Sequence, residues 1–309
     1  MQKNILRIIG GIGVIIWAYT YIKNPSFPTP DKLLIFAFFA GLAFNEAIEM
    51  IKRVSPFILI MLIYDIFRGF ADYLNQNVNY HFMPEFDKFI SFGHLPTKVL
   101  QNIFWDGHVK WYDFLLYGIY MLHFVLPVAL LIFIWKKKPE QYWRYVTAFG
   151  LLSFFGFLTY VFYPAAPPWM ATEYGVIEPI HRISSDVWWA MGIKDFPSLY
   201  NEISPNLVAA VPSLHAAYAT LILIFVTKIF RSKWRYLAAL YPLGIYFGTV
   251  YMGEHYLFDE LLGSVYALVA YKLSKPVKSY LVVKYYNYMH PHYRRHKNRL
   301  KQFTSGLFR

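Results

Sequence analysis

The sequence contains no cysteine, although it is 309 residues long. Disulfide bonds, thiolate nucleophiles and thiolate metal sites are therefore excluded, and cysteine usage says nothing about the compartment. Charged residues are also scarce: they make up 16% of the chain, whereas a soluble domain carries roughly 25%. No repeat of fixed period and no low-complexity tract is present. An ordinary soluble domain is therefore a poor description of this chain.

What the chain has instead is apolar sequence, with 57% hydrophobic residues. These residues gather in runs of about 18 or more, the length that a helix needs to cross the hydrocarbon core. We therefore predict an all-α fold, a polytopic membrane helix bundle of about eight spans. The first run follows Lys3 and Arg7 but lacks a small-residue cleavage pattern, so we expect it to be retained as a span. The spans are expected near residues 5–22, 32–50, 55–74, 113–135, 145–163, 208–228, 234–252 and 256–273.

This pattern divides the chain into four regions. Residues 1–74 hold the N-terminal spans, and residues 113–273 hold the later ones. Between them, residues 75–112 form an interfacial amphipathic segment, which we expect to lie at the membrane surface rather than to cross it. Residues 274–309 form a basic tail, expected to touch anionic lipid headgroups.

The net charge of +12 indicates the orientation of the chain in the membrane. Lys and Arg collect on the cytoplasmic side of membrane proteins, so we expect the bilayer and not a nucleic acid as the partner of this charge. Both termini are predicted to be cytoplasmic, and the sixth and eighth spans then begin at the extracytoplasmic face. The basic residues of the cytoplasmic connections are Lys3, Arg7, Lys52, Arg53, Lys136, Lys137, Lys138, Arg144, Lys228, Arg231, Lys233 and Arg235.

The sixth span opens with "VPSLHAAYA", whose polar residues a membrane helix does not need. Pro212 suits the first turn of a helix, where its missing N–H costs nothing. Ser213 can cap the helix or bind an anion, because free N–H groups and the helix dipole favour phosphate there. His215 stands one turn further in, at the edge of that position.

The eighth span begins within "GEHYLFDELLG", which carries His255 and Asp259. Their i, i+4 spacing places them on one helix face. An Asp that accepts from one imidazole nitrogen leaves the other nitrogen free to act as a nucleophile or base. Both stretches reach the same side of the membrane, which favours a shared site over two unrelated interfacial groups. Two histidines and an aspartate could also bind zinc, so a metal site is an alternative.

In order and spacing, "PSLH" and "H-x-x-x-D" resemble the second and third signatures of the type 2 phosphatidic acid phosphatase superfamily. The resemblance covers about residues 113–273 and implies a six-span catalytic core. It implies that His255 attacks phosphorus to form a phosphohistidine, that Asp259 orients His255, and that His215 protonates the leaving group. Ser213 would help to bind the phosphate.

The sequence departs from the family where phosphate-binding cations usually stand. "YVFYPAAPPWM" replaces the first signature with its Lys and Arg, and the Ser-Arg that usually opens the third signature is missing. This pattern is similar to the inositol phosphorylceramide synthase-like branch. Arg68 in "DIFRG" would then supply a missing charge, although a snorkelling interfacial Arg is an equal alternative. Arg182 is a second candidate, and Tyr163 would form part of the headgroup wall or simply end the fifth span.

These observations lead us to expect an integral cell-membrane enzyme that transfers a phosphoryl group from a lipid phosphate or phosphodiester at the extracytoplasmic face. A phospholipid headgroup phosphotransferase is favoured, with inositol or another lipid as the hydroxyl acceptor. The alternatives are a lipid phosphate or polyprenyl pyrophosphate phosphatase, and a non-catalytic lipid transporter or binding protein. We expect no cofactor and no metal, because side chains and a helix terminus supply the positive charge.

Overall fold

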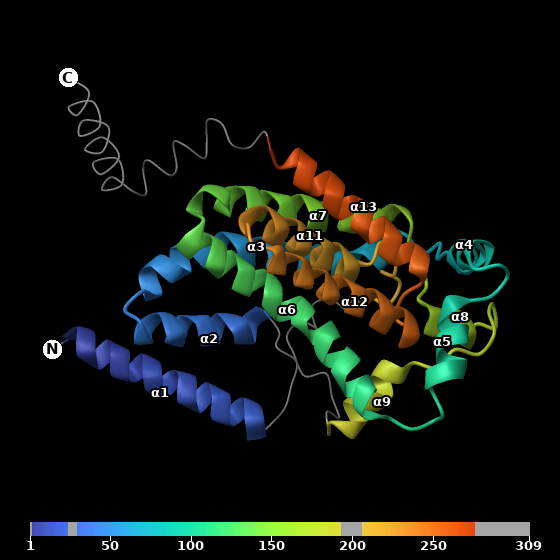
Figure 1. Ribbon diagram of the computed structural model, residues 1–309, viewed down its shortest axis with the longest axis horizontal. Helices are drawn as coiled ribbons and strands as arrows, with labels where there is room; N and C mark the ends of the chain where they lie inside the picture. The colour runs from blue at the N-terminus through green and yellow to red at the C-terminus, as the bar shows by residue number, and fades with distance from the viewer. Residues whose placement is uncertain (1, 24–29, 193–205, 276–309) are drawn as a thin grey trace.

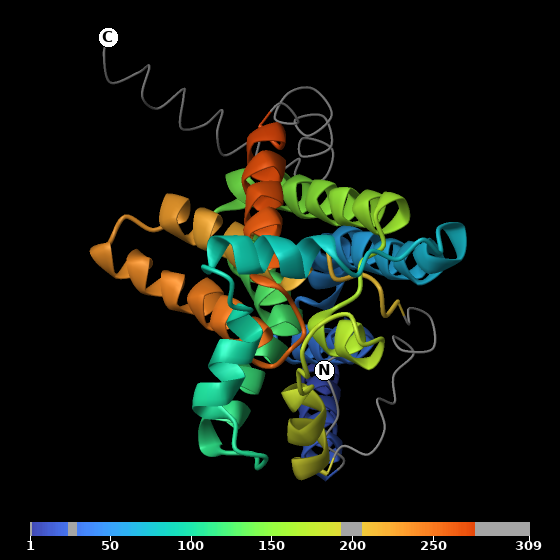
Figure 2. The ribbon, with the colours of Figure 1, turned by 90° about the vertical axis from the view of Figure 1, so that its right-hand side faces the viewer.

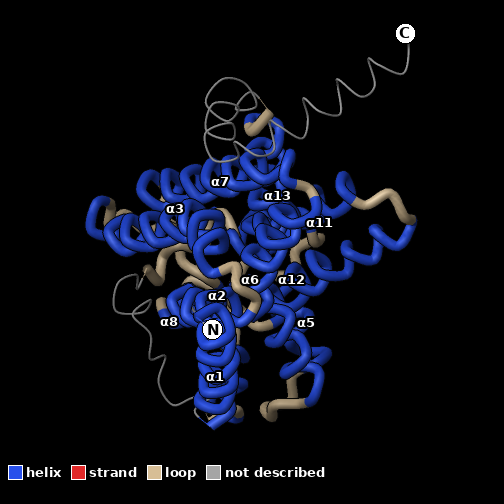
Figure 3. The backbone as a smooth tube through the Cα atoms, turned by 90° about the vertical axis from the view of Figure 1, so that its left-hand side faces the viewer, coloured by secondary structure: helices blue, strands red, loops and turns tan. Residues whose placement is uncertain are grey.

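The structure, a computed structural model, describes residues 2–23, 30–192 and 206–275, and in these ranges the chain forms helices and no strand (Figure 3). The predicted all-α membrane bundle is thereby confirmed. Of the predicted basic tail, residues 276–309 lie outside the described ranges. The helices are α1 (Gln2–Lys23), α2 (Pro30–Ala43), α3 (Ala47–Leu74), α4 (Phe82–Ile90), α5 (Pro96–Phe104), α6 (Trp111–Lys137), η1 (Pro139–Gln141), α7 (Tyr142–Phe162), α8 (Pro168–Glu173), α9 (Ile183–Ala190), α11 (Leu214–Ile229), η2 (Lys233–Ala239), α12 (Leu240–Tyr251) and α13 (Leu257–Leu273).

Each of the eight predicted spans corresponds to a helix. In the described ranges, α1, α3, α6 and α7 with its preceding turn are long and apolar enough to cross a membrane, and α11 is apolar but shorter. The predicted boundary between the second and third spans was wrong. The chain leaves α2 at Ala43 and turns at Asn45, whose φ of 57° is a left-handed conformation that Asn tolerates better than most residues. The third helix therefore begins at Ala47, earlier than expected.

A bundle of α3, α6, α7, α11, α12 and α13 forms the body of the protein (Figure 1). Its core is aromatic: the ring of Phe57 on α3 lies 4.3 Å from that of Phe149 and 5.9 Å from that of Tyr145, both on α7. Tyr145 in turn meets Phe225 of α11 edge-on. Close packing of this kind is what holds helices together where lipid tails are as apolar as the side chains. The pair α1 and α2 lies to one side, attached through α2 to α3.

The segment predicted to be interfacial forms two short helices, α4 and α5. Each has nine residues, too few to cross the hydrocarbon core. One face of each is apolar and exposed, with Phe89 on α4 and Ile103 on α5, while Asp87 and Gln101 on the opposite faces are buried. The α4 helix crosses the N-terminal end of α13 (Figure 2). The segment therefore lies against the end of the bundle at which α13 begins.

Helix α13 approaches the beginning of α11 unusually closely. A Cβ atom on Gly263 would lie 2.3 Å from the backbone oxygen of Ser213, so only glycine fits there. The N–H of Ser213 donates to the backbone oxygen of Asp259 at 3.1 Å. The two sequence motifs that lie forty residues apart are thus joined side by side through the backbone.

Candidate active site

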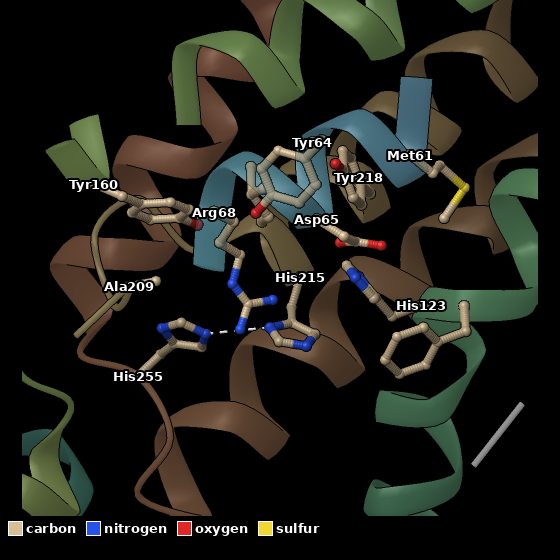
Figure 4. A pocket seen from close by; sticks show the side chains of 12 residues that line it. Met61, Tyr64, Asp65, Arg68, His123, Tyr160, Ala209, His215, Tyr218 and His255 are labelled. Carbon is tan, nitrogen blue, oxygen red and sulfur yellow. Dashed lines mark hydrogen bonds between the residues drawn. The ribbon is translucent and has the colours of Figure 1, made fainter. Parts of the chain in front are cut away.

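A pocket lies between α3, α6, α7 and the beginning of α11, and three histidine side chains line it (Figure 4). The complete lining is Met61, Tyr64, Asp65, Arg68, His123, Phe124, Tyr160, Ala209, Leu214, His215, Tyr218 and His255. The ionisable side chains in this lining are Asp65 and Arg68 of α3, His123 of α6, and the histidines of the two sequence motifs, His215 and His255. The pocket therefore combines ionisable groups with apolar walls.

Asp259, His255 and His215 form one chain of contacts. His255 Nδ1 lies 3.3 Å from Asp259 Oδ2, and His255 Nε2 lies 3.2 Å from His215 Nδ1. The same Asp259 oxygen accepts from the N–H of Tyr256 at 2.9 Å, which fixes the carboxylate. A proton on His255 Nδ1 that donates to this carboxylate leaves the lone pair of Nε2 directed toward His215. The three residues that the sequence singled out are thus adjacent.

The surroundings of His255 favour its charged form. Burial lowers the pKa of His255, but the hydrogen bond to Asp259 and the negative charges of Glu260 and Glu254 more than offset it, so the pKa lies above its ordinary value. Glu260 is fully buried and accepts a hydrogen bond from Thr249 Oγ1 at 2.7 Å. A reaction in which Nε2 attacks, as the family resemblance implies, would need this proton to be lost and would accelerate as the pH rises through this pKa.

Arg68 reaches the pocket from α3. Its guanidinium lies beside His255 and His215, with Tyr64 above it in the view (Figure 4). Asp65 stands one turn earlier on the same helix and interacts electrostatically with Arg68. A guanidinium at this place can donate two parallel hydrogen bonds from its fork of N–H groups to two oxygens of an anion. Arg68 therefore lines the same pocket as both motif histidines, and its role as a phosphate ligand stays a prediction.

His123 and Asp65 also line the pocket, and neither was among the residues predicted from the sequence. His123 and Tyr120 of α6 both pack against the His215 ring, each with ring centroids 4.3 Å apart. His123 Nδ1 is buried without a hydrogen-bond partner. An ionisable residue inside an apolar span is a functional candidate by default, and that rule could have found both residues.

Ser213, Tyr163 and Arg182 are not among the residues that line the pocket. Ser213 is fully buried and caps α11, where its Oγ accepts from the N–H of Ala216 at 3.3 Å. Arg182 donates to both carboxylate oxygens of Glu254, at 2.8 and 3.3 Å, and packs over the ring of Trp169. That these three residues bind phosphate or substrate stays a prediction.

The proline-rich element "YPAAPPW" connects α7 to α8. Pro168 begins α8, and the backbone oxygen of Pro164 accepts from the N–H of Asn79 at 2.8 Å. Ala165 forms isolated bridges with Asn79 and Ala209, and Ala209 lines the pocket. The element thus supports the pocket wall through its backbone.

Two comparisons with known proteins bear on this site. A sequence model described as the PAP2 superfamily matches residues 87–273. Among curated proteins, the chain is 32% identical to the phosphoinositol dihydroceramide synthase of Bacteroides thetaiotaomicron, over 77% of this chain and 80% of that protein.

Two fungal proteins are also similar. The chain is 26% identical to the inositol phosphorylceramide synthase catalytic subunit of Saccharomyces cerevisiae, over 84% of this chain and 65% of that protein. It is 26% identical to the corresponding subunit of Schizosaccharomyces pombe, over 52% of this chain and 39% of that protein. The chain thus spans less than two thirds of the length of each of these fungal relatives. No solved structure matches.

Proposed function

Because this chain belongs to the PAP2 superfamily, we propose that it is a membrane enzyme that transfers a phosphorylated headgroup from one lipid to the hydroxyl of another. The observation that carries the proposal is the contact chain of Asp259, His255 and His215, which ends in a pocket that also holds Arg68. The relatives named as synthases of inositol-containing sphingolipids favour an inositol phospholipid as donor and a ceramide as acceptor.

In the first step, His255 Nε2 attacks the phosphorus of the donor lipid. The bond between phosphorus and the diacylglycerol oxygen breaks, and His215 protonates that oxygen as it leaves. Asp259 holds the Nδ1 proton and stabilises the imidazolium character that develops on His255. The phosphate must first separate the 3.2 Å contact between the two histidines, so the hydrogen bond seen here is replaced by contacts to the substrate.

In the second step, the hydroxyl of the acceptor lipid attacks the phosphorus of the phosphohistidine. His215, now neutral, takes the hydroxyl proton, and the bond between phosphorus and His255 Nε2 breaks. Arg68 neutralises the phosphate oxygens in both steps. If water attacked the phosphohistidine instead, inositol phosphate would leave and the protein would hydrolyse its donor lipid, so exclusion of water from the pocket decides the outcome.

The proposal is tested by following a phosphate label. Purified protein in detergent receives an inositol phospholipid labelled at phosphorus, with and without dihydroceramide, and His255→Ala is assayed beside the wild type. The exposed His108 provides the matched control, His108→Ala. Label in a new sphingolipid supports the transferase. Label in water-soluble inositol phosphate would indicate hydrolysis, and free phosphate released from a labelled lipid phosphate assayed in parallel would indicate a phosphatase. Binding of lipid without movement of label would indicate a non-catalytic protein.

We propose further that both termini are cytoplasmic and that the pocket opens at the extracytoplasmic face. The chain offers a direct test because it has no cysteine. His108→Cys, in the connection before α6, should react with a membrane-impermeant maleimide in intact cells. Lys137→Cys, at the opposite end of α6, should react only after the membrane is opened. The reverse labelling would invert the proposed orientation.

The proposed reaction uses no metal, since Arg68 and the imidazoles supply the positive charge. Dialysis against EDTA should leave turnover unchanged. A loss of activity that zinc restores would support instead the zinc alternative built on His215, His255 and Asp259.

A further inference from the structure

The loop that carries His255 connects the C-terminus of α12 with the N-terminus of α13. Both helix ends expose backbone groups that have no partner within their own helix, carbonyl oxygens on α12 and N–H groups on α13. In this protein, buried side chains from the two short helices α4 and α5 bond to these groups. The attachment therefore lies on both sides of His255.

Asp87 of α4 holds the end that follows His255. Its Oδ2 accepts from the N–H of Leu257 at 2.8 Å, and its Oδ1 accepts from the N–H of Phe258 at 2.9 Å. The side chain is fully buried, so water does not compete for these bonds. A carboxylate that receives two N–H groups at a helix N-terminus also interacts favourably with the helix dipole. The start of α13 is thus attached to α4, two residues after His255.

Gln101 of α5 holds the end that precedes His255. Its Nε2 donates to the carbonyl oxygen of Tyr251, the last residue of α12, at 2.9 Å. The same side chain donates to the oxygen of His181 at 2.7 Å and accepts from the N–H of His181 at 2.9 Å. Gln101 is 5% exposed, and all of these contacts join segments far apart in the sequence.

The middle of the loop rests on the segment that Gln101 holds. Gly253 has a φ of 78°, and a Cβ atom there would lie 2.9 Å from the backbone oxygen of His181. The next residue, Glu254, is paired with Arg182. The loop is therefore fixed before, within and after the short stretch that ends in His255.

We infer that Asp87 and Gln101 are positioning residues that set the place of His255 Nε2 by fixing the two ends of its loop. This inference rests on the proposed role of His255 as the nucleophile. Asp259 orients the imidazole ring, but it sits on α13 itself and moves with that helix. Contacts from other elements must fix the loop: Ser213 bonds to the backbone of α13 from the beginning of α11, and Asp87 and Gln101 attach the two ends of the loop to α4 and α5.

The test uses Asp87→Asn and Gln101→Met, which keep the side-chain size and remove hydrogen bonds. Because a displacement of about 1 Å can cost 10²-fold in rate, we expect kcat to fall by about tenfold to a hundredfold in each variant. KM for the donor lipid should stay within about twofold, since neither residue lines the pocket. Single-turnover formation of the phosphohistidine should slow by the same factor as kcat.

The matched controls are Glu85→Gln on α4 and Asn102→Leu on α5, whose side chains are exposed. Both should retain wild-type kcat. Unchanged kcat in Asp87→Asn and Gln101→Met, or a rise of KM alone, would overturn the inference. Activity that persists in His255→Ala would overturn the proposed function instead, so the two failures are distinguishable.

Hydrogen–deuterium exchange of the wild-type protein adds a measurement that does not depend on folding of a variant. The N–H groups of Leu257 and Phe258 occupy the first turn of α13, where amides ordinarily exchange with solvent quickly. Their bonds to Asp87 should make them exchange as slowly as amides inside the helix. Fast exchange at these two positions would contradict the attachment.

Discussion

The pocket has two walls that differ in origin and in chemistry. One wall comes from α6, α11 and the loop before α13, all within the region that matches the family, and it carries the three histidines. The other wall is α3, which lies outside that region and carries Arg68 and Asp65. The histidine nitrogens and the Arg68 guanidinium therefore belong to separate parts of the chain.

The two walls are also held in place differently. Hydrogen bonds fix the histidine wall: His255 contacts Asp259 and His215, and its loop is tied to α4 and α5. Packing holds most of α3, where Phe57 is fully buried against α7, and Asn206 Nδ2 donates to the backbone oxygen of Arg68 at 2.9 Å. Hydrogen bonds therefore position the His255 side chain itself, whereas the contacts that hold α3 are made by its packing and its backbone.

The largest effect should come from the histidine wall. His255→Ala removes the attacking nitrogen, so turnover should fall by about 10⁴-fold or more, as for other enzymes that lose their nucleophile. Transfer of labelled headgroup measures the loss, and size-exclusion chromatography checks the fold. Turnover within tenfold of wild type would place the nucleophile elsewhere.

Substitution in the α3 wall should cost less. Arg68→Ala removes one charged partner of the phosphate and should lower kcat/KM by about 10²-fold, with partial recovery in Arg68→Lys. Lys52→Ala, an exposed cation on the same helix, is the control and should have no effect. If Arg68→Ala left the kinetics unchanged, Arg68 would be a lipid anchor and the α3 wall would only fill space.

Substitution of Arg182, which lies outside the pocket lining, should lower activity less than substitution of Arg68. Arg182→Gln breaks the pair with Glu254 next to His255, and we expect kcat to fall by less than about tenfold with KM unchanged. Steady-state kinetics with the donor lipid separate the two parameters. A tenfold or greater rise in KM would show that Arg182 contacts the substrate phosphate after all.

The smallest effect should be a displacement of the pH profile. The acidic limb of kcat/KM should lie above about 6.5, the ordinary pKa of histidine, because His255 must be deprotonated to attack and its pKa is raised. Glu260→Gln keeps an acceptor for Thr249 but removes one negative charge near His255. The pKa of His255 then falls, so the limb should move to lower pH. An acidic limb that does not move in this variant would show that a group other than His255 determines it.

The sequence predicted the histidine wall better than the α3 wall for a physical reason. His215, His255 and Asp259 lie at helix beginnings, and membrane orientation forces those beginnings to one face, so local motifs and span order suffice. The family resemblance carried by the same motifs was confirmed by the match over residues 87–273. Arg68 followed only from resemblance, because nothing local in α3 distinguishes a phosphate ligand from a snorkelling residue.

The contacts made by α4 and α5 were beyond sequence reasoning. The segment was predicted to be amphipathic, but the partners of Asp87 are 170 and 171 residues away. The partner of Gln101 on α12 is 150 residues away. No local sequence pattern predicts that an Asp or Gln side chain will form a hydrogen bond with a backbone group at that separation. His123 and Asp65 were missed although each interrupts an apolar span, which was a readable signal.

The bond between Asp87 and the start of α13 has a consequence for how the protein is made. The ribosome synthesises Asp87 before α6, and Leu257 only after α12, so the carboxylate has no partner while most of the chain enters the membrane. The two ends can meet only after the last of these helices has been inserted. The loop that carries His255 is thus fixed late in synthesis, so we expect the proposed activity to begin only when biosynthesis of these helices is complete.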